Sequence, residues 1–115
     1  MEEFEVVFYQ KANGEYPAKE FINAQPVKMR AKIYRQMAVL QAAGNALREP
    51  DSKSLGDGIF ELRTKQGSDI TRVLYFFFVG KQIVLTNGFV KKTDKTPPRE
   101  IQKALQYRED YIHRR

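Results

Sequence analysis

The chain has 115 residues, 20 Lys and Arg against 14 Asp and Glu, a formal net charge of +6 and no cysteine. This length supports one hydrophobic core, so we expect a single domain over residues 1–115. The positive charge favours RNA, DNA, an anionic membrane or an acidic protein as partner. The lack of cysteine excludes disulfides, thiolate catalysis and cysteine-ligated zinc.

The first half of the chain predicts one strand and two helices. Phe4 to Tyr9 mixes β-branched and aromatic residues and is expected to form a strand. A short helix is expected over Ala18 to Ala24. A longer helix begins at Pro26, has apolar residues at helical spacing, and is expected to end at Gly44 or Asn45.

The second half predicts a loop followed by an antiparallel meander. The segment from Ala46 to Gly58 is polar and rich in turn-forming residues, so it is expected to be a loop. Three strands then follow, over Ile59 to Thr64, Ile70 to Val79 and Gln82 to Val90, joined by short turns. The aromatic run Tyr75 to Phe78 marks the central strand, covered on both faces.

A last helix is expected over Pro97 to His113, with Thr96 as its N-terminal cap. The predicted fold is therefore α+β: a small antiparallel sheet with the two N-terminal helices packed on it and a C-terminal helix. The C-terminal helix either docks on the sheet or packs on a partner.

The sequence gives no indication of a membrane location. Residues Met1 to Phe4 lack the basic and apolar regions of a signal peptide. The longest apolar run, Val73 to Val79, is far too short to span a bilayer. We therefore expect a cytoplasmic protein with no membrane partner.

Three cationic segments lie at the ends of apolar strands: Glu61-Leu62-Arg63, Thr71 to Tyr75, and Gly88 to Thr93. Holding charge beside buried strands is costly, so such a cluster requires a partner, and the natural partner is a polyanion. RNA cleavage by its own 2′-hydroxyl needs proton transfer and stabilisation of a phosphorane, which Lys and Arg can supply. A histidine pair is unnecessary, and the chain has one histidine, His113.

Three stretches together resemble a known group of proteins: Leu55 to Arg63, Arg72 to Tyr75, and Phe89 to Pro97. They are similar to the RelE/ParE toxin superfamily, and most similar to its HigB-like, phage Gp49-like branch. The resemblance implies a toxin of a type II toxin–antitoxin system that cleaves mRNA on the ribosome without a metal or other cofactor. It also implies a cognate antitoxin, often of the helix-turn-helix type.

The resemblance assigns roles to four cations. Arg72 matches the arginine that follows the turn of the meander and would clamp the transition state, since a guanidinium can grip two phosphate oxygens. Arg63 would hold the neighbouring phosphate. Lys91 and Lys92 match a basic pair after the last strand, and we favour Lys92 for chemistry and Lys91 for binding. A simpler interpretation of Arg72 is a surface ion pair with Glu61 or Asp69.

Further basic side chains are expected to contact RNA, or to form a solvated surface. The two assigned to RNA binding are Lys53 and Lys95. The basic residues of the longer helix, which ribosomal RNA contact would tolerate, are Lys28, Arg30, Lys32 and Arg35.

The general base remains open among several groups. Some RelE members carry lysines on the strand before the first arginine, whereas Ile59 and Glu61 occupy those positions here. Glu49, which resembles the glutamate of a YoeB-like scheme, is one candidate. A lysine, Tyr111 and His113 are the others.

Two alternative functions follow from the same residues. ParE members share the fold and block DNA gyrase, so a ParE-like gyrase inhibitor is one alternative. A catalytically inactive module that binds RNA or an antitoxin is the other, because Glu61 at a lysine-like position is compatible with lost activity.

Overall fold

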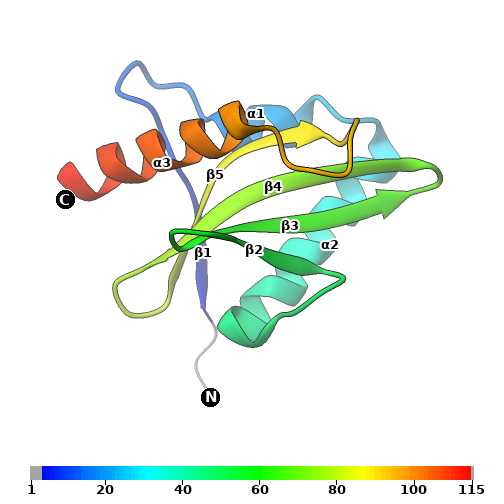
Figure 1. The fold of residues 1–115 in the computed structure, drawn as a ribbon, viewed down its shortest axis with the longest axis horizontal. Coiled ribbons are helices and arrows are strands. Elements are labelled where there is room, and N and C mark those ends of the chain that lie inside the picture. Colours follow the sequence, from blue (N-terminus) through cyan, green and yellow to red (C-terminus); the bar gives the residue numbers. More distant parts are fainter. Residues whose placement is uncertain (1–3, 115) are drawn as a thin grey trace.

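The computed structural model describes residues 4–114 as one mixed sheet with helices on both faces (Figure 1). The strands are β1 (Glu5–Phe8), β2 (Ser52–Gly56), β3 (Ile59–Gln66), β4 (Asp69–Phe78) and β5 (Gln82–Val90). The helices are α1 (Pro17–Asn23), α2 (Val27–Ala43) and α3 (Pro98–His113), and a short 3-10 helix, η1 (Gly44–Ala46), follows α2. The α+β fold expected from the sequence is confirmed.

The strand order is β1-β5-β4-β3-β2, so the aromatic strand β4 is central, as predicted. Strands β2 to β5 pair antiparallel, but β1 pairs parallel to β5, with Glu5 opposite Gln82. The expected antiparallel sheet is therefore mixed, because its first strand runs parallel to its neighbour. The local pattern of the first strand carries no information on its direction, because its partner lies far along the chain.

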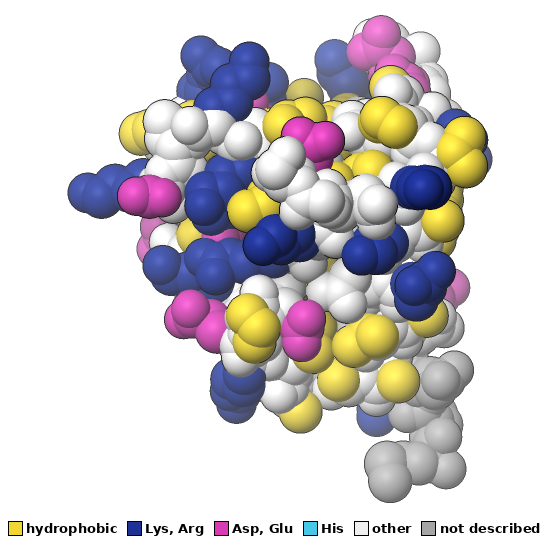
Figure 2. Space-filling view, turned by 90° about the vertical axis from the view of Figure 1, so that its right-hand side faces the viewer, with side chains coloured by type: hydrophobic (Ala, Val, Ile, Leu, Met, Phe, Trp, Pro, Cys, Tyr) yellow, Lys and Arg dark blue, Asp and Glu magenta, His cyan; other side chains and the backbone are white. Residues whose placement is uncertain are grey.

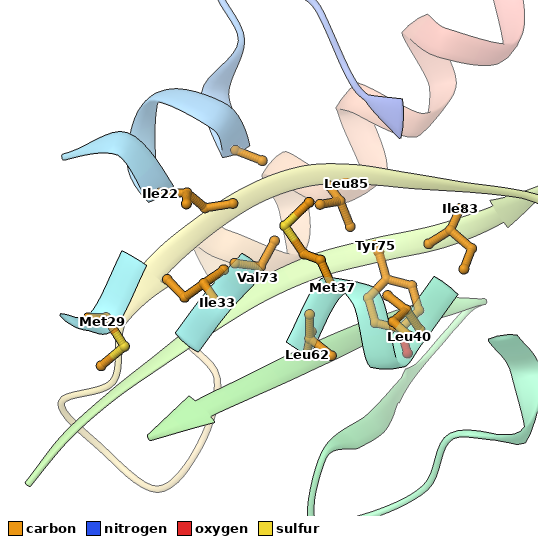
Figure 3. Close-up of a cluster of buried hydrophobic side chains, with 11 residues drawn as sticks. Ile22, Met29, Ile33, Met37, Leu40, Leu62, Val73, Tyr75, Ile83 and Leu85 are labelled. Carbon is orange, nitrogen blue, oxygen red and sulfur yellow. The ribbon is translucent and has the colours of Figure 1, made fainter. Parts of the chain in front are cut away.

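Alternate side chains of the strands face two separate cores. On one face, Leu62, Val73 and Tyr75 pack against α1 and α2, where Ile22 and Ile33 are fully buried. Figure 3 shows side chains of α1 and α2 gathered in one cluster with those of these strands. This core holds both N-terminal helices on one face of the sheet.

The opposite face of the sheet carries α3. Leu74 and Phe76 of β4 pack with Ala104 and Tyr111 of α3, which settles that this helix docks on its own sheet. The C-terminal end of α3 is fastened by Tyr9, whose hydroxyl donates a hydrogen bond of 2.6 Å to an Asp110 carboxylate oxygen. Within residues 4–114, every helix is too short or too polar to traverse a bilayer.

The predicted helices and the three meander strands are confirmed within a few residues. Gly44 ends α2 with a φ of +57°, a conformation that favours glycine, as expected. The predicted loop over residues 46–58 is wrong, because Ser52–Gly56 forms the edge strand β2. Its sequence is mostly polar, and pairing of Ser52 with Leu62 and of Lys53 with Glu61 holds it in the sheet.

The predicted role of Thr96 as a helix cap is also wrong. The N-cap of α3 is Pro97, and no side chain donates or accepts a capping hydrogen bond there. The hydroxyl of Thr96 instead donates to the carboxylate of Glu61, on the strand beneath. The residue is thus part of the site described next, and the proline pair alone marks the start of the helix.

Candidate functional site

Arg63 and Arg72 lie directly opposite each other in the antiparallel ladder of β3 and β4. The short turn at residues 67–68 fixes this register, so the two side chains leave the same face of the sheet. Like charges in directly opposed positions destabilise a sheet. An additional group must therefore compensate the two arginines.

Glu61 is that group. It lies two residues before Arg63 on the same strand, which places it on the same face, and its side chain is fully buried. Its Oε2 accepts a hydrogen bond of 2.9 Å from Arg63 Nε and lies 3.4 Å from Arg72 Nη1. Its Oε1 accepts the hydrogen bond from Thr96 Oγ1, at 2.5 Å. Both carboxylate oxygens are thus engaged.

Arg72 is buried at the centre of this cluster, with only 5% of its side chain exposed. Besides its ion pair with Glu61, Nη1 donates to the carbonyl oxygen of Asp94 at 3.3 Å and to Thr96 Oγ1 at 3.2 Å. Within the described residues, Arg72 Nε is buried without a hydrogen-bond partner. The simpler interpretation of Arg72 as an ion pair on an exposed strand face is wrong in its exposure and right in naming Glu61.

A cleft of about 510 Å³ opens beside the arginine pair. Six of its lining residues are basic: Lys32, Arg35, Arg63, Lys65, Arg72 and Lys91. The lining contains one acidic residue, Asp51, whose Oδ1 accepts a hydrogen bond of 3.2 Å from Gln36 of α2. Figure 2 looks at the end of the molecule that carries the tip of the β3–β4 hairpin, and Lys and Arg side chains predominate there over Asp and Glu. The cleft is suited to a polyanion.

The two adjacent lysines that follow β5 line different hollows. Lys91 lines the cleft, and its backbone N–H donates to the carbonyl oxygen of Ile70 at 2.8 Å, which holds it beside the hairpin. Lys92 is exposed and lines a different hollow, together with Lys95. Lys53 is exposed on β2 and lines a third hollow beside Glu49.

The candidate general bases lie in different parts of the molecule. Glu49 Oε1 lies 3.7 Å from Arg63 Nη1, with 65% of the Glu49 side chain exposed to solvent. Tyr111 is buried in the α3 core, where its hydroxyl donates to Gln82 at 2.8 Å, and His113 is exposed beside Glu109. Neither of them lines the cleft. Asp51 is the carboxylate in the cleft wall, and Glu49, which lines a neighbouring hollow, contacts the site through Arg63.

The sequence did not predict the roles of Glu61 and Thr96, or that Asp51 and Lys65 line the cleft. Glu61 shares a strand face with Arg63 by simple alternation, and this signal could have placed it between the arginines. The contact of Thr96 depends on how the loop of residues 91–97 folds back, which no local pattern records. Among residues 4–114, no three His, Asp or Glu side chains form a group that could hold a metal ion.

Comparison with known protein families shows to which family the chain belongs. The family model described as phage derived protein Gp49-like (DUF891) matches residues 20–109, so the chain belongs to this family. The matched region includes Glu61, Arg63, Arg72 and Lys91, together with most of α3. No curated protein matches the chain. Membership of the family is consistent with a toxin of a toxin–antitoxin system.

Proposed function

We propose that the protein is the toxin of a type II toxin–antitoxin system and a ribosome-dependent mRNA endoribonuclease. The observation that carries this proposal is the convergence of Arg63, Arg72 and Lys91 on one basic cleft. The resemblance of the same segments to RelE and HigB-like toxins, and membership of the Gp49-like family, support it. In this proposal the RNA 2′-hydroxyl attacks the adjacent phosphate without a metal ion.

The arginine pair provides the main catalytic contribution in this scheme. Attack on phosphorus generates a phosphorane with additional negative charge, and preorganised cations stabilise it more than they stabilise the ground state. Arg72 is suited to this role because burial and its contacts with Glu61 and Thr96 restrict its motion. Arg63 is more exposed, at 23% of its side chain, and would bind the neighbouring phosphate.

Proton transfer is assigned to one group in the cleft and to one that contacts Arg63 from beside it. Lys91 lines the cleft with both arginines, so we assign it the proton donated to the departing 5′-oxygen. Glu49 is assigned the proton of the 2′-hydroxyl, since its exposed carboxylate lies 3.7 Å from Arg63 Nη1 and is accessible to RNA. Lys92, which lines a different hollow, is assigned to binding along with Lys53 and Lys95.

The proposed partners are the ribosome with its mRNA, and an antitoxin of the helix-turn-helix type. Basic side chains surround the cleft on α2 as well as on the sheet, which suits contact with ribosomal RNA. Lys32 and Arg35 of α2 line the cleft. An antitoxin that covers the cleft would silence the enzyme.

The test is induction of the protein in a bacterium, with mRNA 5′ ends mapped within minutes while protein and DNA synthesis are followed. The inactive variant should be Arg63→Gln, because Arg63 is partly exposed and its loss does not leave Glu61 without Arg72. The matched control is Lys19→Ala, which also removes one cation but lies on the exposed surface of α1.

New cuts within translated mRNA, given by the wild type and Lys19→Ala but not by Arg63→Gln, would support the proposal. Growth arrest with intact mRNA and early inhibition of DNA replication would instead identify a gyrase inhibitor. Normal growth after induction of the folded wild-type protein would identify an inactive binding module.

A further inference from the structure

A fully buried carboxylate in a site for polyanions is unexpected on electrostatic grounds. Glu61 lowers the positive charge of the cleft wall that RNA would approach. It also carries a desolvation cost, and a well-packed apolar side chain is often as stabilising as a buried ion pair. Stability alone therefore does not account for Glu61.

The contacts of Glu61 account for it in geometric terms. One oxygen, Oε2, bonds Arg63 Nε and pairs with Arg72 Nη1, and the other accepts from Thr96. The carboxylate thereby fixes two guanidinium groups that would otherwise repel each other across the ladder. Through Thr96 it also fixes the end of the loop that carries Lys91.

We infer that Glu61 is a positioning residue that aligns Arg63 and Arg72 and fastens the 91–97 loop beside them. This inference rests on the proposed ribonuclease function. Arg63 Nε and Arg72 Nη1 bind Glu61, Arg63 Nη1 pairs with Glu49, and Arg72 Nε is buried. A phosphate would therefore meet Nη2 of each guanidinium. Glu61 itself does not act as the general base, since both of its oxygens are occupied and its side chain is closed to solvent.

If Glu61 positions the arginines, its substitution should slow RNA cleavage without weakening RNA binding. Glu61→Gln removes a negative charge, so the cleft becomes more positive and should bind an uncleavable RNA as tightly as the wild type or more tightly. The amide oxygen can still accept from the arginines and the amide N–H₂ can donate to Thr96, but the uncharged amide holds the two guanidinium groups less firmly than a carboxylate does. We expect kcat for mRNA cleavage on ribosomes to fall by about 100-fold, the effect of losing one oriented donor, with little rise in KM.

The experiment compares the wild type, Glu61→Gln, Glu61→Asp and the control Glu15→Gln, which removes one exposed carboxylate that pairs with Lys11. Binding is measured with a short 2′-O-methyl RNA, cleavage with translating ribosomes, and folding by circular dichroism. The Nε–H resonance of Arg63 is followed by NMR, since its hydrogen bond to Glu61 slows its exchange with water.

The expected result is a slow but RNA-binding Glu61→Gln variant with rapid exchange at Arg63 Nε–H, and unchanged behaviour of Glu15→Gln. Cleavage at the wild-type rate by folded Glu61→Gln would overturn the inference, and so would a parallel loss of binding and cleavage. If Glu61→Gln does not fold, Glu61→Asp decides. It keeps the charge but withdraws the carboxylate by one methylene, so full activity of this variant would refute positioning.

Failure of the proposed function gives a different pattern. If the wild type cleaves no RNA, the ribonuclease proposal is contradicted. The NMR comparison then still judges whether Glu61 orients Arg63, because that signal does not depend on activity.

Discussion

The hydroxyl of Thr96 and the carboxylate of Glu61 join the loop before α3 to the middle of β3. The two residues are distant in sequence, and their contact brings the cation of Lys91 and the arginine pair into one wall of the cleft. The same hydroxyl also accepts from Arg72 Nη1. A single side chain therefore couples loop, strand and arginine.

Replacement of Thr96 by valine should lower stability without shortening α3. The variant removes the donor to a buried carboxylate, which typically costs about 1–3 kcal/mol of the free energy of unfolding. Because Thr96 does not cap α3, the helical circular dichroism signal should stay unchanged. Thr96→Ser, which keeps the hydroxyl, should retain most of the stability in urea denaturation. Loss of helical signal in the folded valine variant would restore the capping role.

Arg72→Ala should destabilise the fold as well as impair cleavage. It leaves Glu61 buried with Arg63 and Thr96 as its remaining partners, and breaking a buried ion pair typically costs about 3–5 kcal/mol. In the double variant with Glu61→Leu, part of this loss should be recovered, because no buried charge is left unpaired. Urea denaturation of the four proteins in the cycle measures the coupling. Strictly additive losses would mean that the two side chains do not interact.

Lys91→Ala and Lys92→Ala should differ, although the two lysines are adjacent. Lys91 lines the cleft, so its loss should slow cleavage by about 100-fold or more, the usual effect of removing a positioned donor. Lys92→Ala should cleave at nearly the wild-type rate and bind RNA more weakly. Single-turnover cleavage on ribosomes provides the comparison. The reverse order of effects would return the acid role to Lys92, as the sequence first suggested.

Lys53→Ala and Lys95→Ala should weaken RNA binding to a similar extent for all sequences. Both side chains are exposed outside the main cleft, where they would meet phosphates and not bases. Each loss should lower the slope of log affinity against log salt by roughly one, as expected for one phosphate contact. Titrations of 2′-O-methyl RNA at several salt concentrations test this. An unchanged slope would exclude the lysine from the interface.

Stability should fall at high pH because of Tyr9. Burial raises the pKa of Tyr9 from its ordinary value of 10 to about 12, and the hydrogen bond to Asp110 adds to this shift. The folded protein holds the phenol proton more tightly than the unfolded chain, so this stabilisation is complete below pH 10 and is lost between pH 10 and 12. After solvent screening it amounts to about 1–2 kcal/mol.

The Tyr9→Phe variant provides the comparison for this titration. It lacks the phenol, so its free energy of unfolding should decline less steeply than that of the wild type between pH 10 and 12. Burial also raises the pKa of Tyr75, which titrates in both proteins and cancels in the difference. Parallel stability curves for the two proteins would contradict the role of Tyr9.

The helices and the central strands could be predicted because their apolar residues repeat at the period of the structure they form. The edge strand β2 could not, since Ser52 and Lys53 have no strand pattern and depend on β3 for their conformation. The parallel pairing of β1 was hidden for a similar reason. Its partner β5 lies in a distant part of the chain.

In the candidate site, too, some features could be predicted from the sequence and others could not. Arg63 and Arg72 could be brought together from sequence, because a short turn between two strands fixes which residues face each other. Lys91 and Lys92 could not be told apart, since the direction of each side chain after β5 depends on the loop. From sequence alone, Glu61 indicates a departure from the lysine pattern of RelE members. Its role depends on contacts with Arg63, Arg72 and Thr96, which only the fold brings together.

The parallel pairing of β1 with β5 has a consequence for synthesis on the ribosome. The first strand of the sheet to be made must wait for the last one before it gains a neighbour, so the sheet cannot be completed on a partial chain. Lys91 and Thr96 follow β5 directly. A nascent chain that ends before β5 has neither the complete sheet nor Lys91 and Thr96, so the protein acquires its full sheet and its basic wall at nearly the same late stage of translation.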